Sequence, residues 1–332
     1  MIAKKIVINK FGPAESLDLE TFEMTEQLAP DEVIIEVHYS GVNFADIIMR
    51  LGYYRDAPKK PFVPGYEVSG IVLSIGSKVT KLVVGDKVVA GTRFGGYGSH
   101  QKLHEDLVVK LAPEADLQLW AAIPVNYITS HIALNEFGRI RKGDRILLDC
   151  ASGGVGVMAM QIAKDAGASV VGLTTSPSKK EFIEGYGATA YTHDEFYQSS
   201  EKDFDFILNS SAGPALDWQY KRLAKAGKLC CIGVQSAITN GKTNPLTFLK
   251  TVITMPKFGV IKNIMQSKMV GGFNALKFFE DEKWLKDNLN VLSKSKCTPY
   301  IGGVYKVADV AAAHRALEQK QVRGKVLIDW RS

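Results

Sequence analysis

A short glycine-rich segment carries the clearest chemical signal in the sequence. It reads Ala-Ser-Gly-Gly-Val-Gly at residues 151–156, between a strand predicted at 144–150 and a helix predicted at 154–166. Glycine at 153 would let the backbone approach a diphosphate, and glycine at 156 would let the helix pack closely on the strand. The helix N-terminus adds unpaired N–H groups and positive partial charge. The segment predicts a dinucleotide site, against the alternative of a tight turn that uses glycine for steric reasons alone. The expected phosphate contacts are Ser152, Gly153, Gly154, Val155 and Gly156.

The residues after the next predicted strand indicate which dinucleotide is bound. Sites for NAD usually carry Asp or Glu at this point, where the carboxylate accepts from the ribose hydroxyls. Here residues 173–180 read Leu-Thr-Thr-Ser-Pro-Ser-Lys-Lys, with no acid. Hydroxyl and ammonium groups can instead bind a 2′-phosphate, so we predict NADPH, contacted by Thr175, Ser176 and Lys179. The alternative is a solvated helix start at which Ser176 and Ser178 are ordinary caps.

Further cofactor contacts are expected where two later strands end. In an open α/β sheet, ligands bind outside the carboxyl ends of the strands. The strands predicted at 204–208 and 228–232 are followed by Asn209 and Ser210, and by Gly233 and Val234. We predict that these four residues line the cofactor site, largely through their backbone.

The elements that position these residues change in character along the chain. Residues 1–110 read as short strands separated by turns, for example 33–37, 70–75 and 87–90, which predicts an antiparallel barrel-like or sandwich-like domain. From residue 117, helices at 117–139, 154–166, 179–186 and 215–226 alternate with strands at 144–150, 169–175, 204–208 and 228–232. That alternation predicts a doubly wound parallel sheet. A helix at 307–318 and a strand at 324–330 then return to the first style. We predict one domain from residues 1–122 with 300–332, and a second from 123–299.

Composition limits the classes of protein that fit. The chain has 332 residues, 46% hydrophobic and 23% charged, with a formal net charge of +6. This is typical of a soluble globular protein of two domains. The lysines are spread along the chain, so no nucleic-acid partner is expected. The first ten residues do not resemble a secretory signal, and the four cysteines form no C-x-x-C pair. Reduced cysteines and a cytoplasmic location are predicted.

Several short motifs, taken in order, resemble those of one family. They include residues 40–46 with Arg50, Gly52 and Tyr54, then 64–70, 85–88, the glycine turn and 324–327. The chain resembles the medium-chain dehydrogenase/reductases over essentially its whole length, and within them the zinc-independent quinone oxidoreductase branch. Residues 125–130 and the basic segment after Asn244 look most like the vesicle-amine-transport-protein-like group. The resemblance implies a GroES-like β-barrel-type catalytic domain with a Rossmann doubly wound domain, and a homodimer.

Two positions argue against a metal site. Zinc-dependent members carry Cys where this chain has Asn43, and His where it has Tyr66. An amide and a phenol are poor zinc ligands beside a thiolate and an imidazole. The pair His100 and His104 has the spacing of a helical metal pair, but it lies in a predicted strand, where four residues span roughly 13 Å. We therefore predict no metal.

The resemblance also implies the catalytic residues. Asn43 and Tyr54 match positions beside the nicotinamide, Thr129 lies near it in relatives, and Tyr66 is expected to line the substrate cleft. The alternatives are that Tyr54 is a packing residue and that the Thr129 hydroxyl bonds back to a helix carbonyl. Lys325 is a family element near the cofactor and a candidate phosphate or ribose contact. Many relatives place a stacking tyrosine on the adenine side, where this chain has Asp194.

These observations favour one reaction. Without a Lewis acid, hydride transfer from NADPH suits a quinone or an α,β-unsaturated carbonyl, whose product oxygen needs only hydrogen-bond donors. We predict an NADPH-dependent oxidoreductase acting on such a small electrophile, and the alternative is an NADPH-binding interaction or regulatory module with little turnover. Residues 245–275 mix apolar residues with lysines, which fits a substrate lid, a membrane-surface patch or a dimer contact. We expect a solvated face on a packed core, without membrane contact.

Overall fold

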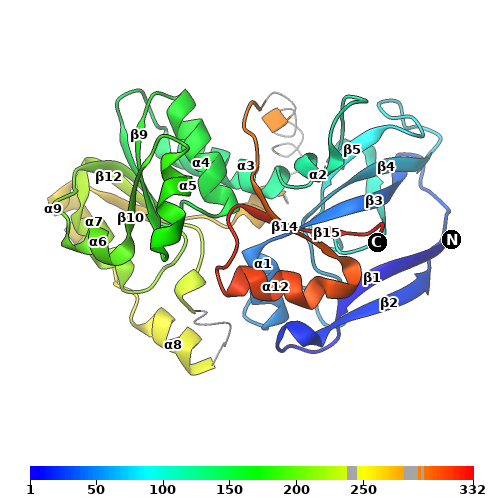
Figure 1. Cartoon of the computed structure of the whole chain (residues 1–332), viewed down its shortest axis with the longest axis horizontal. Coiled ribbons are helices and arrows are strands. Elements are labelled where there is room, and N and C mark those ends of the chain that lie inside the picture. Colours follow the sequence, from blue (N-terminus) through cyan, green and yellow to red (C-terminus); the bar gives the residue numbers. More distant parts are fainter. Residues whose placement is uncertain (238–244, 280–283, 285–290, 293–294) are drawn as a thin grey trace. The chain divides into compact units, whose positions relative to one another are not determined.

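The structure is a computed structural model that describes the chain except for residues 238–244, 280–283, 285–290 and 293–294 (Figure 1). The chain divides into two compact units. Unit 1 comprises Met1–Val125 and Leu276–Ser332, and unit 2 comprises Asn126–Ala275. The sequence predicts that the chain returns from the second domain to the first at residue 300, not at residue 276. The two divisions therefore differ over residues 123–125 and 276–299, and only part of the second range is described.

Unit 1 is built on a mainly antiparallel sheet. Its strands run in the order β14 (Ile301–Lys306), β15 (Lys325–Asp329), β3 (Glu32–Val42), β4 (Glu67–Ile75), β5 (Lys87–Gly91) and β7 (Val108–Lys110), and β6 (His100–His104) also pairs with β3. A separate antiparallel pair joins β1 (Ile2–Ile8) to β2 (Leu17–Glu23). Strand β15 lies antiparallel to β3, with Leu327 opposite Gly41. Residues distant in the sequence therefore meet in the middle of this sheet.

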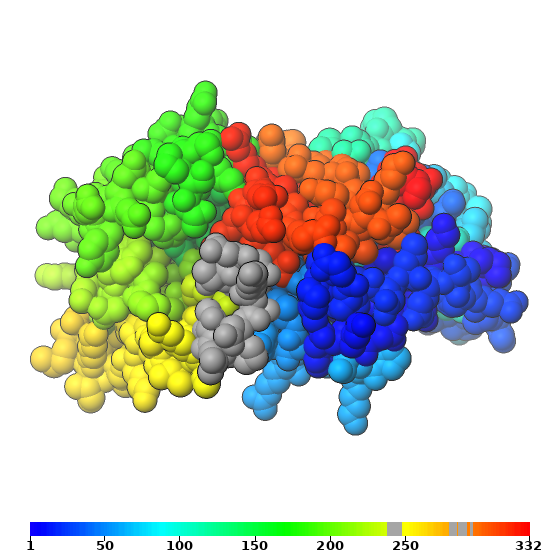
Figure 2. Space-filling view, turned by 60° about the horizontal axis from the view of Figure 1, so that its bottom comes forward, coloured from blue at the N-terminus to red at the C-terminus, as the bar shows by residue number. Residues whose placement is uncertain are grey.

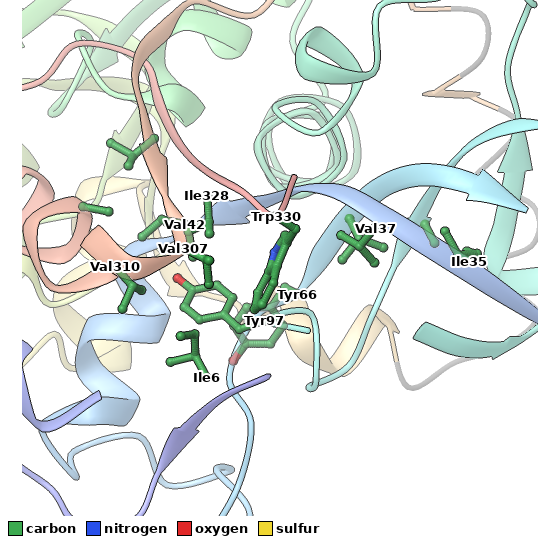
Figure 3. Close-up of a cluster of buried hydrophobic side chains, with 14 of the residues drawn as sticks. Ile6, Ile35, Val37, Val42, Tyr66, Tyr97, Val307, Val310, Ile328 and Trp330 are labelled. Carbon is green, nitrogen blue, oxygen red and sulfur yellow. The ribbon is translucent and has the colours of Figure 1, made fainter. Parts of the chain in front are cut away.

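The core of unit 1 is formed by branched apolar side chains and large aromatic rings. Figure 3 shows Trp330, Tyr97 and Tyr66 among the aliphatic residues of β1, β3 and β15. Trp330 donates its indole N–H to Ser40 Oγ at 2.7 Å, which satisfies a buried polar group. Helices α1 (Phe44–Arg50) and α12 (Val310–Glu318) contact each other and are joined by the buried ion pair of Arg50 with Glu318. The short helix α2 (Leu117–Trp120) also belongs to unit 1.

Unit 2 contains a six-stranded parallel sheet. The order is β10 (Thr189–Thr192), β9 (Ser169–Thr174), β8 (Arg145–Leu148), β11 (Phe204–Asn209), β12 (Leu223–Cys231) and β13 (Met269–Gly272). Counted along the chain this order is 3-2-1-4-5-6, which is the doubly wound Rossmann order. From β8 the chain adds β9 and β10 on one side, and then returns to add β11, β12 and β13 on the other side. Folds of this kind bind dinucleotides at this switch point, between β8 and β11. The predicted fold of this region is confirmed.

Except for α3, which precedes β8, the helices of unit 2 follow its strands. They are α3 (Pro124–His131), which starts just before the unit boundary, α4 (Gly154–Asp165), α5 (Lys180–Glu184), α6 (His193–Gln198), α7 (Ala215–Lys221), α8 (Pro245–Ile253) and α9 (Val260–Gln266) (Figure 1). The helix α10 (Ala275–Phe279) begins at the last residue of unit 2.

Two predicted helices are wrong in extent. The helix predicted at 215–226 ends at Lys221, and residues from Leu223 onward form β12. Leu223 pairs with Phe204, so sheet pairing overrides the helix propensity of the Leu-Ala-Lys-Ala run. The helix predicted at 117–139 is divided into α2, α3 and a π-helical turn at Ile132–Gly138. The strands β10 and β13 were not predicted.

The segment 245–275 differs from the solvated face on a packed core that its sequence suggests. Helix α9 has no buried residue, and Val260, Ile261, Ile264 and Met265 are each at least 66% exposed. The segment that contains α8 and α9 forms the yellow to orange part of the surface in Figure 2. None of the helices within the described residues combines the length and apolarity needed to cross a membrane.

Candidate functional site

The glycine turn lies between β8 and α4. At two of its glycines, a Cβ would come too close to other atoms of the protein. A Cβ on Gly156 would lie 2.4 Å from the carbonyl oxygens of both Cys150 and Ala151. A Cβ on Gly154 would lie 2.4 Å from Asn126 Nδ2. The contacts at Gly156 are with backbone that cannot move aside, so the packing of α4 against the turn requires glycine there, whereas at Gly154 the Asn126 side chain would have to shift.

Gly153 is different because the protein itself does not require a glycine there. The nearest atom to a Cβ on Gly153 would be the Cys150 carbonyl oxygen at 3.5 Å, an ordinary contact. Gly153 precedes the twelve residues of α4, whose first N–H groups have no partner within the helix. The turn therefore leaves space over a helix N-terminus that favours anions. A dinucleotide diphosphate fits this arrangement.

A buried carboxylate joins the ends of the central strands of unit 2. Asp149 follows β8 and is fully buried. It accepts from Asn209 Nδ2 at 3.1 Å, Gln219 Nε2 at 3.2 Å and the Ser211 N–H at 3.2 Å. His193 Nε2 lies 2.9 Å from Asp149 Oδ1. Burial by itself raises the pKa of the Asp149 carboxyl, but the hydrogen bond and charge of His193, with the bonds from Ser211, hold that pKa below its ordinary value. Asp149 is therefore ionised at neutral pH.

The structure brings the predicted contacts at the ends of β11 and β12 together. The Ser210 carbonyl accepts from the Gln235 N–H at 3.1 Å, and the Gly233 carbonyl accepts from the Cys231 thiol at 3.4 Å. The Asn209 side chain is engaged within the protein, since it donates to Asp149 and Gln219 and accepts from the Ala212 N–H. Asn209 thus shapes the strand ends, while Val234 is partly exposed beside them. Contact of these four residues with a cofactor stays a prediction.

The loop after β9 carries the residues predicted to contact a 2′-phosphate. Thr175 is exposed, Ser176 is partly exposed, and its Oγ lies 2.8 Å from Ser178 Oγ. Ser176 makes no side-chain cap to the following 3-10 turn, so its alternative role as a cap is not seen. Lys179 is buried at 7% exposure. Its part in phosphate binding stays a prediction.

In unit 1, Asn43 belongs to a buried polar cluster. Its Nδ2 donates to Glu67 Oε1 at 3.0 Å, and its Oδ1 accepts from Lys325 Nζ at 2.5 Å. Lys325 also forms an ion pair with Glu67, and both side chains are at most 3% exposed. The second oxygen of Glu67 accepts from the Val125 N–H at 2.8 Å. The cluster therefore connects the residue after β3, the strands β4 and β15, and the last residue of the first segment of unit 1.

This cluster changes the interpretation of Lys325. The sequence treats it as a phosphate or ribose contact, whereas the structure places its ammonium inside unit 1, held by Glu67 and Asn43. A buried charge is stable only with such partners. The ammonium also bears on the metal prediction, because it contacts the side chain that stands where zinc-dependent relatives carry a cysteine. Within the described ranges, no group of three or more His, Cys, Asp or Glu side chains could hold a metal ion.

The side chain of Asp46 holds the backbone of Asn43 through a hydrogen bond. Its Oδ2 accepts from the Asn43 N–H at 2.8 Å and from the Tyr97 hydroxyl at 3.2 Å, and its Oδ1 accepts from the Gly65 N–H at 3.0 Å. The first of these bonds is half of a capping box at the start of α1, as expected for an acid three residues into a helix. Burial raises the pKa of Asp46 to about 7.

The two tyrosines predicted for catalysis lie in unit 1, and Thr129 lies in unit 2. Tyr66 is 5% exposed, its ring lies 5.7 Å from that of Phe94, and its hydroxyl lies 3.7 Å from Met49 Sδ. Burial, and then the neighbouring Tyr54, raise the pKa of Tyr66. Tyr54 is partly buried against the same core. Thr129 lies in α3 and is 8% exposed. The structure thus groups Asn43, Tyr54 and Tyr66 in one unit, and their catalytic roles stay predictions.

Comparisons with known proteins assign the chain to a family. Residues 29–113 match the model of the alcohol dehydrogenase GroES-like domain, and residues 154–269 match the model of the zinc-binding dehydrogenases. The synaptic vesicle membrane protein VAT-1 homolog of Danio rerio is 30% identical over 98% of this chain and 69% of that protein. The chain belongs to the quinone oxidoreductase/VAT-1 group of the medium-chain dehydrogenase/reductases. Within this group, the quinone oxidoreductase of Lama guanicoe is 27% identical over 98% of this chain and 97% of its own length.

Solved structures support the fold of this group member. The human VAT-1 homolog-like protein superimposes with a TM-score of 0.83 at 24% identity, covering 100% of this chain and 99% of that one. The Escherichia coli quinone oxidoreductase complexed with NADPH gives a TM-score of 0.83 at 23% identity, covering 98% and 100%. The GroES-like and Rossmann domains expected from the sequence are confirmed.

Three residues of this group member were missed as functional candidates. The sequence alone assigns no role to Glu67, Asp149 or His193. Asp149 and His193 are 44 positions apart, so only the parallel order of the strands they follow brings them together. An acid after the first strand of a Rossmann unit and a histidine after the third would have been the available signal.

Proposed function

We propose that this protein is an NADPH-dependent oxidoreductase that transfers hydride to a quinone or an α,β-unsaturated carbonyl without zinc. The observation that carries the proposal is the glycine turn. Gly156 is required by packing, whereas Gly153 leaves space that the protein does not fill. That space follows β8, at the point where the strand order of the 3-2-1-4-5-6 sheet reverses. Bound NADPH would supply the hydride from C4 of its nicotinamide.

The residues present fit the cofactor. The first N–H groups of α4 and the turn residues Ser152 and Val155 would hold the diphosphate. Thr175, Ser176 and Lys179 would hold the 2′-phosphate, and no acid lies in residues 173–180 to repel it. The Escherichia coli relative with the same fold is described as complexed with NADPH, which supports this choice.

The polar cluster of unit 1 supports chemistry without zinc. The Lys325 ammonium bonds to Asn43 and Glu67, and a cation so close would repel a divalent metal ion at the Asn43 side chain. An amide nitrogen carries two hydrogens. Asn43 donates one to Glu67 and keeps a second donor for a product oxygen. Tyr54 and Thr129 would supply further hydrogen bonds as negative charge develops on that oxygen.

The assembly and location form part of the proposal. A homodimer would cover β13, the last strand of the sheet among the described residues, and the exposed apolar side chains of α9, which are otherwise unfavourable in water. The four cysteines are free thiols, which is typical of a protein of the reducing cytoplasm. We propose no membrane or nucleic-acid partner.

The test is the loss of NADPH absorbance with purified protein and a panel of quinones and enones. We expect turnover with at least one class and much slower oxidation of NADH. Gly153→Ala is the matched control, since its fold should persist while cofactor binding falls. NADPH binding without any turnover across the panel would contradict the oxidoreductase and favour an NADPH-binding regulatory module. A failure to bind NADPH would contradict the cofactor as well.

A further inference from the structure

The imidazole of His193 lies between two hydrogen-bond acceptors in unit 2. Its Nδ1 is 3.1 Å from the carbonyl oxygen of Thr174, the last residue of β9. Its Nε2 is 2.9 Å from Asp149 Oδ1, after β8. His193 itself is the first residue of α6, directly after β10. One ring therefore bridges the carboxyl ends of three adjacent parallel strands.

The two acceptors determine the charge of the ring. A carbonyl oxygen cannot donate, so Nδ1 must carry a hydrogen. Apart from His193, Asp149 accepts from three N–H donors, Gln219 Nε2 at Oδ1 and Asn209 Nδ2 and the Ser211 N–H at Oδ2. These donors favour a carboxylate, and a carboxylate cannot donate, so Nε2 carries a hydrogen too. An imidazole with hydrogens on both nitrogens is a cation. This cation is also the charged partner of the buried Asp149 carboxylate, which needs one.

The position of this cation matters because it borders the loop that follows β9. The second strand of a dinucleotide-binding unit ends beside the 2′ position of the adenosine ribose. The His193 side chain is 28% exposed and Asp149 is fully buried, so the pair presents its positive end outward. The same loop carries Lys179, which is 7% exposed. Lys180 is paired with Glu195, and Asp194 is exposed.

We propose that His193, held as an imidazolium by Asp149 and the Thr174 carbonyl, is a specificity-determining residue that favours the 2′-phosphate of NADPH over the 2′-hydroxyl of NADH. This inference rests on the proposed NADPH-dependent function. It adds a fixed positive charge to the serines, threonine and lysine of the loop. Because both ring nitrogens are already bonded, His193 acts on the phosphate through its charge and orders nothing further when the cofactor binds.

The test compares ligands that differ only in the 2′-phosphate. Dissociation constants of NADPH, NADH, 2′,5′-ADP and 5′-AMP are measured by calorimetry for the wild type and His193→Gln. The amide of Gln keeps a donor but removes the charge. We expect about fivefold weaker binding of NADPH and 2′,5′-ADP, the size of one partly exposed ion pair, and less than about twofold change for NADH and 5′-AMP. His131→Gln is the matched control, since it removes another half-buried histidine of unit 2 and should change none of the four constants.

The outcomes separate the two proposals. Equal weakening of all four ligands, or no change, would overturn the role of His193 while leaving the proposed function intact. A wild type that binds neither NADPH nor 2′,5′-ADP would overturn the proposed function itself. If His193→Gln does not fold, nitrogen-15 spectra of the histidine-labelled wild type decide the matter. A doubly protonated ring that responds to 2′,5′-ADP but not to 5′-AMP supports the proposal, and a neutral His193 ring overturns it.

Discussion

The buried pair of Lys325 and Glu67 gives the sharpest prediction about stability. Lys325→Met removes the ammonium, fills similar volume and leaves the Glu67 carboxylate without a counter-charge. Neither side chain of the pair is more than 3% exposed, so water cannot replace the lost partner. Leaving one member of a buried ion pair alone costs about 3–5 kcal/mol. In a domain of this size class that lowers the melting temperature by roughly 10 °C.

A double-mutant cycle shows whether the cost comes from the pair. Glu67→Gln should also destabilise, because the Lys325 ammonium then remains buried and alone. The double variant Glu67→Gln with Lys325→Met has no charge left and should recover much of the loss, with a coupling of about 2 kcal/mol or more. The free energy of unfolding would be measured by urea denaturation, followed by circular dichroism and tryptophan fluorescence.

A surface pair provides the matched control. Lys110 pairs with Asp86 in the same unit, but its side chain is 50% exposed. Lys110→Met should cost only about 0–1 kcal/mol. The reasoning would be refuted if Lys325→Met cost no more than Lys110→Met. It would also be refuted if the two buried substitutions were additive within about 0.5 kcal/mol.

Two further predictions concern the glycine turn and Asp46, which accepts from the Asn43 N–H. Gly153→Ala should keep the melting temperature and weaken NADPH binding at least about tenfold. Gly156→Ala should lower the melting temperature, because its Cβ would lie 2.4 Å from two carbonyl oxygens. Equal melting temperatures for the two variants would contradict this difference. Burial raises the pKa of Asp46 from 3.8 to about 7, so the folded state holds this proton more tightly than the unfolded chain. Stability is then lost as the pH rises from about 4 to 7, by at most ~1.4 kcal/mol per pH unit. In urea melts, the wild type should therefore be less stable relative to Asp46→Asn at pH 8 than at pH 5, and a constant difference would speak against the raised pKa.

The sequence predicts the features of this fold that depend on local chemistry. The glycine turn, the strand before it and the helix after it are encoded within about twenty residues, and they appear as expected. The capping acid Asp46 is equally local, because helix geometry fixes a spacing of three residues. Resemblance to a family then supplied the two domains, which local patterns alone only suggested.

Features set by tertiary contacts escaped sequence reasoning. Residues 223–226 have good helix formers, yet pairing of β12 with β11 draws Leu223 into the sheet. The sequence suggests Lys325 as a candidate phosphate or ribose contact, and only the pairing of β15 with β3 brings its ammonium to Glu67 and Asn43. His193 meets two acceptors that belong to other parts of the sheet, Thr174 at the end of β9 and Asp149 after β8. None of these partners can be inferred from spacing along the chain.

The central place of β15 has a consequence for biosynthesis. Unit 2 is one continuous stretch, so all of its strands can pair while later residues are still being translated. Unit 1 cannot close in that order, because β15 fills the position between β3 and β14 and carries Lys325, the counter-charge of Glu67. Until residues 325–329 leave the ribosome, β3 has an open edge and Glu67 has no counter-charge from β15. The nascent chain should therefore hold a folded nucleotide-binding unit between two halves of an unfinished one, and protection of that exposed edge would fall to chaperones.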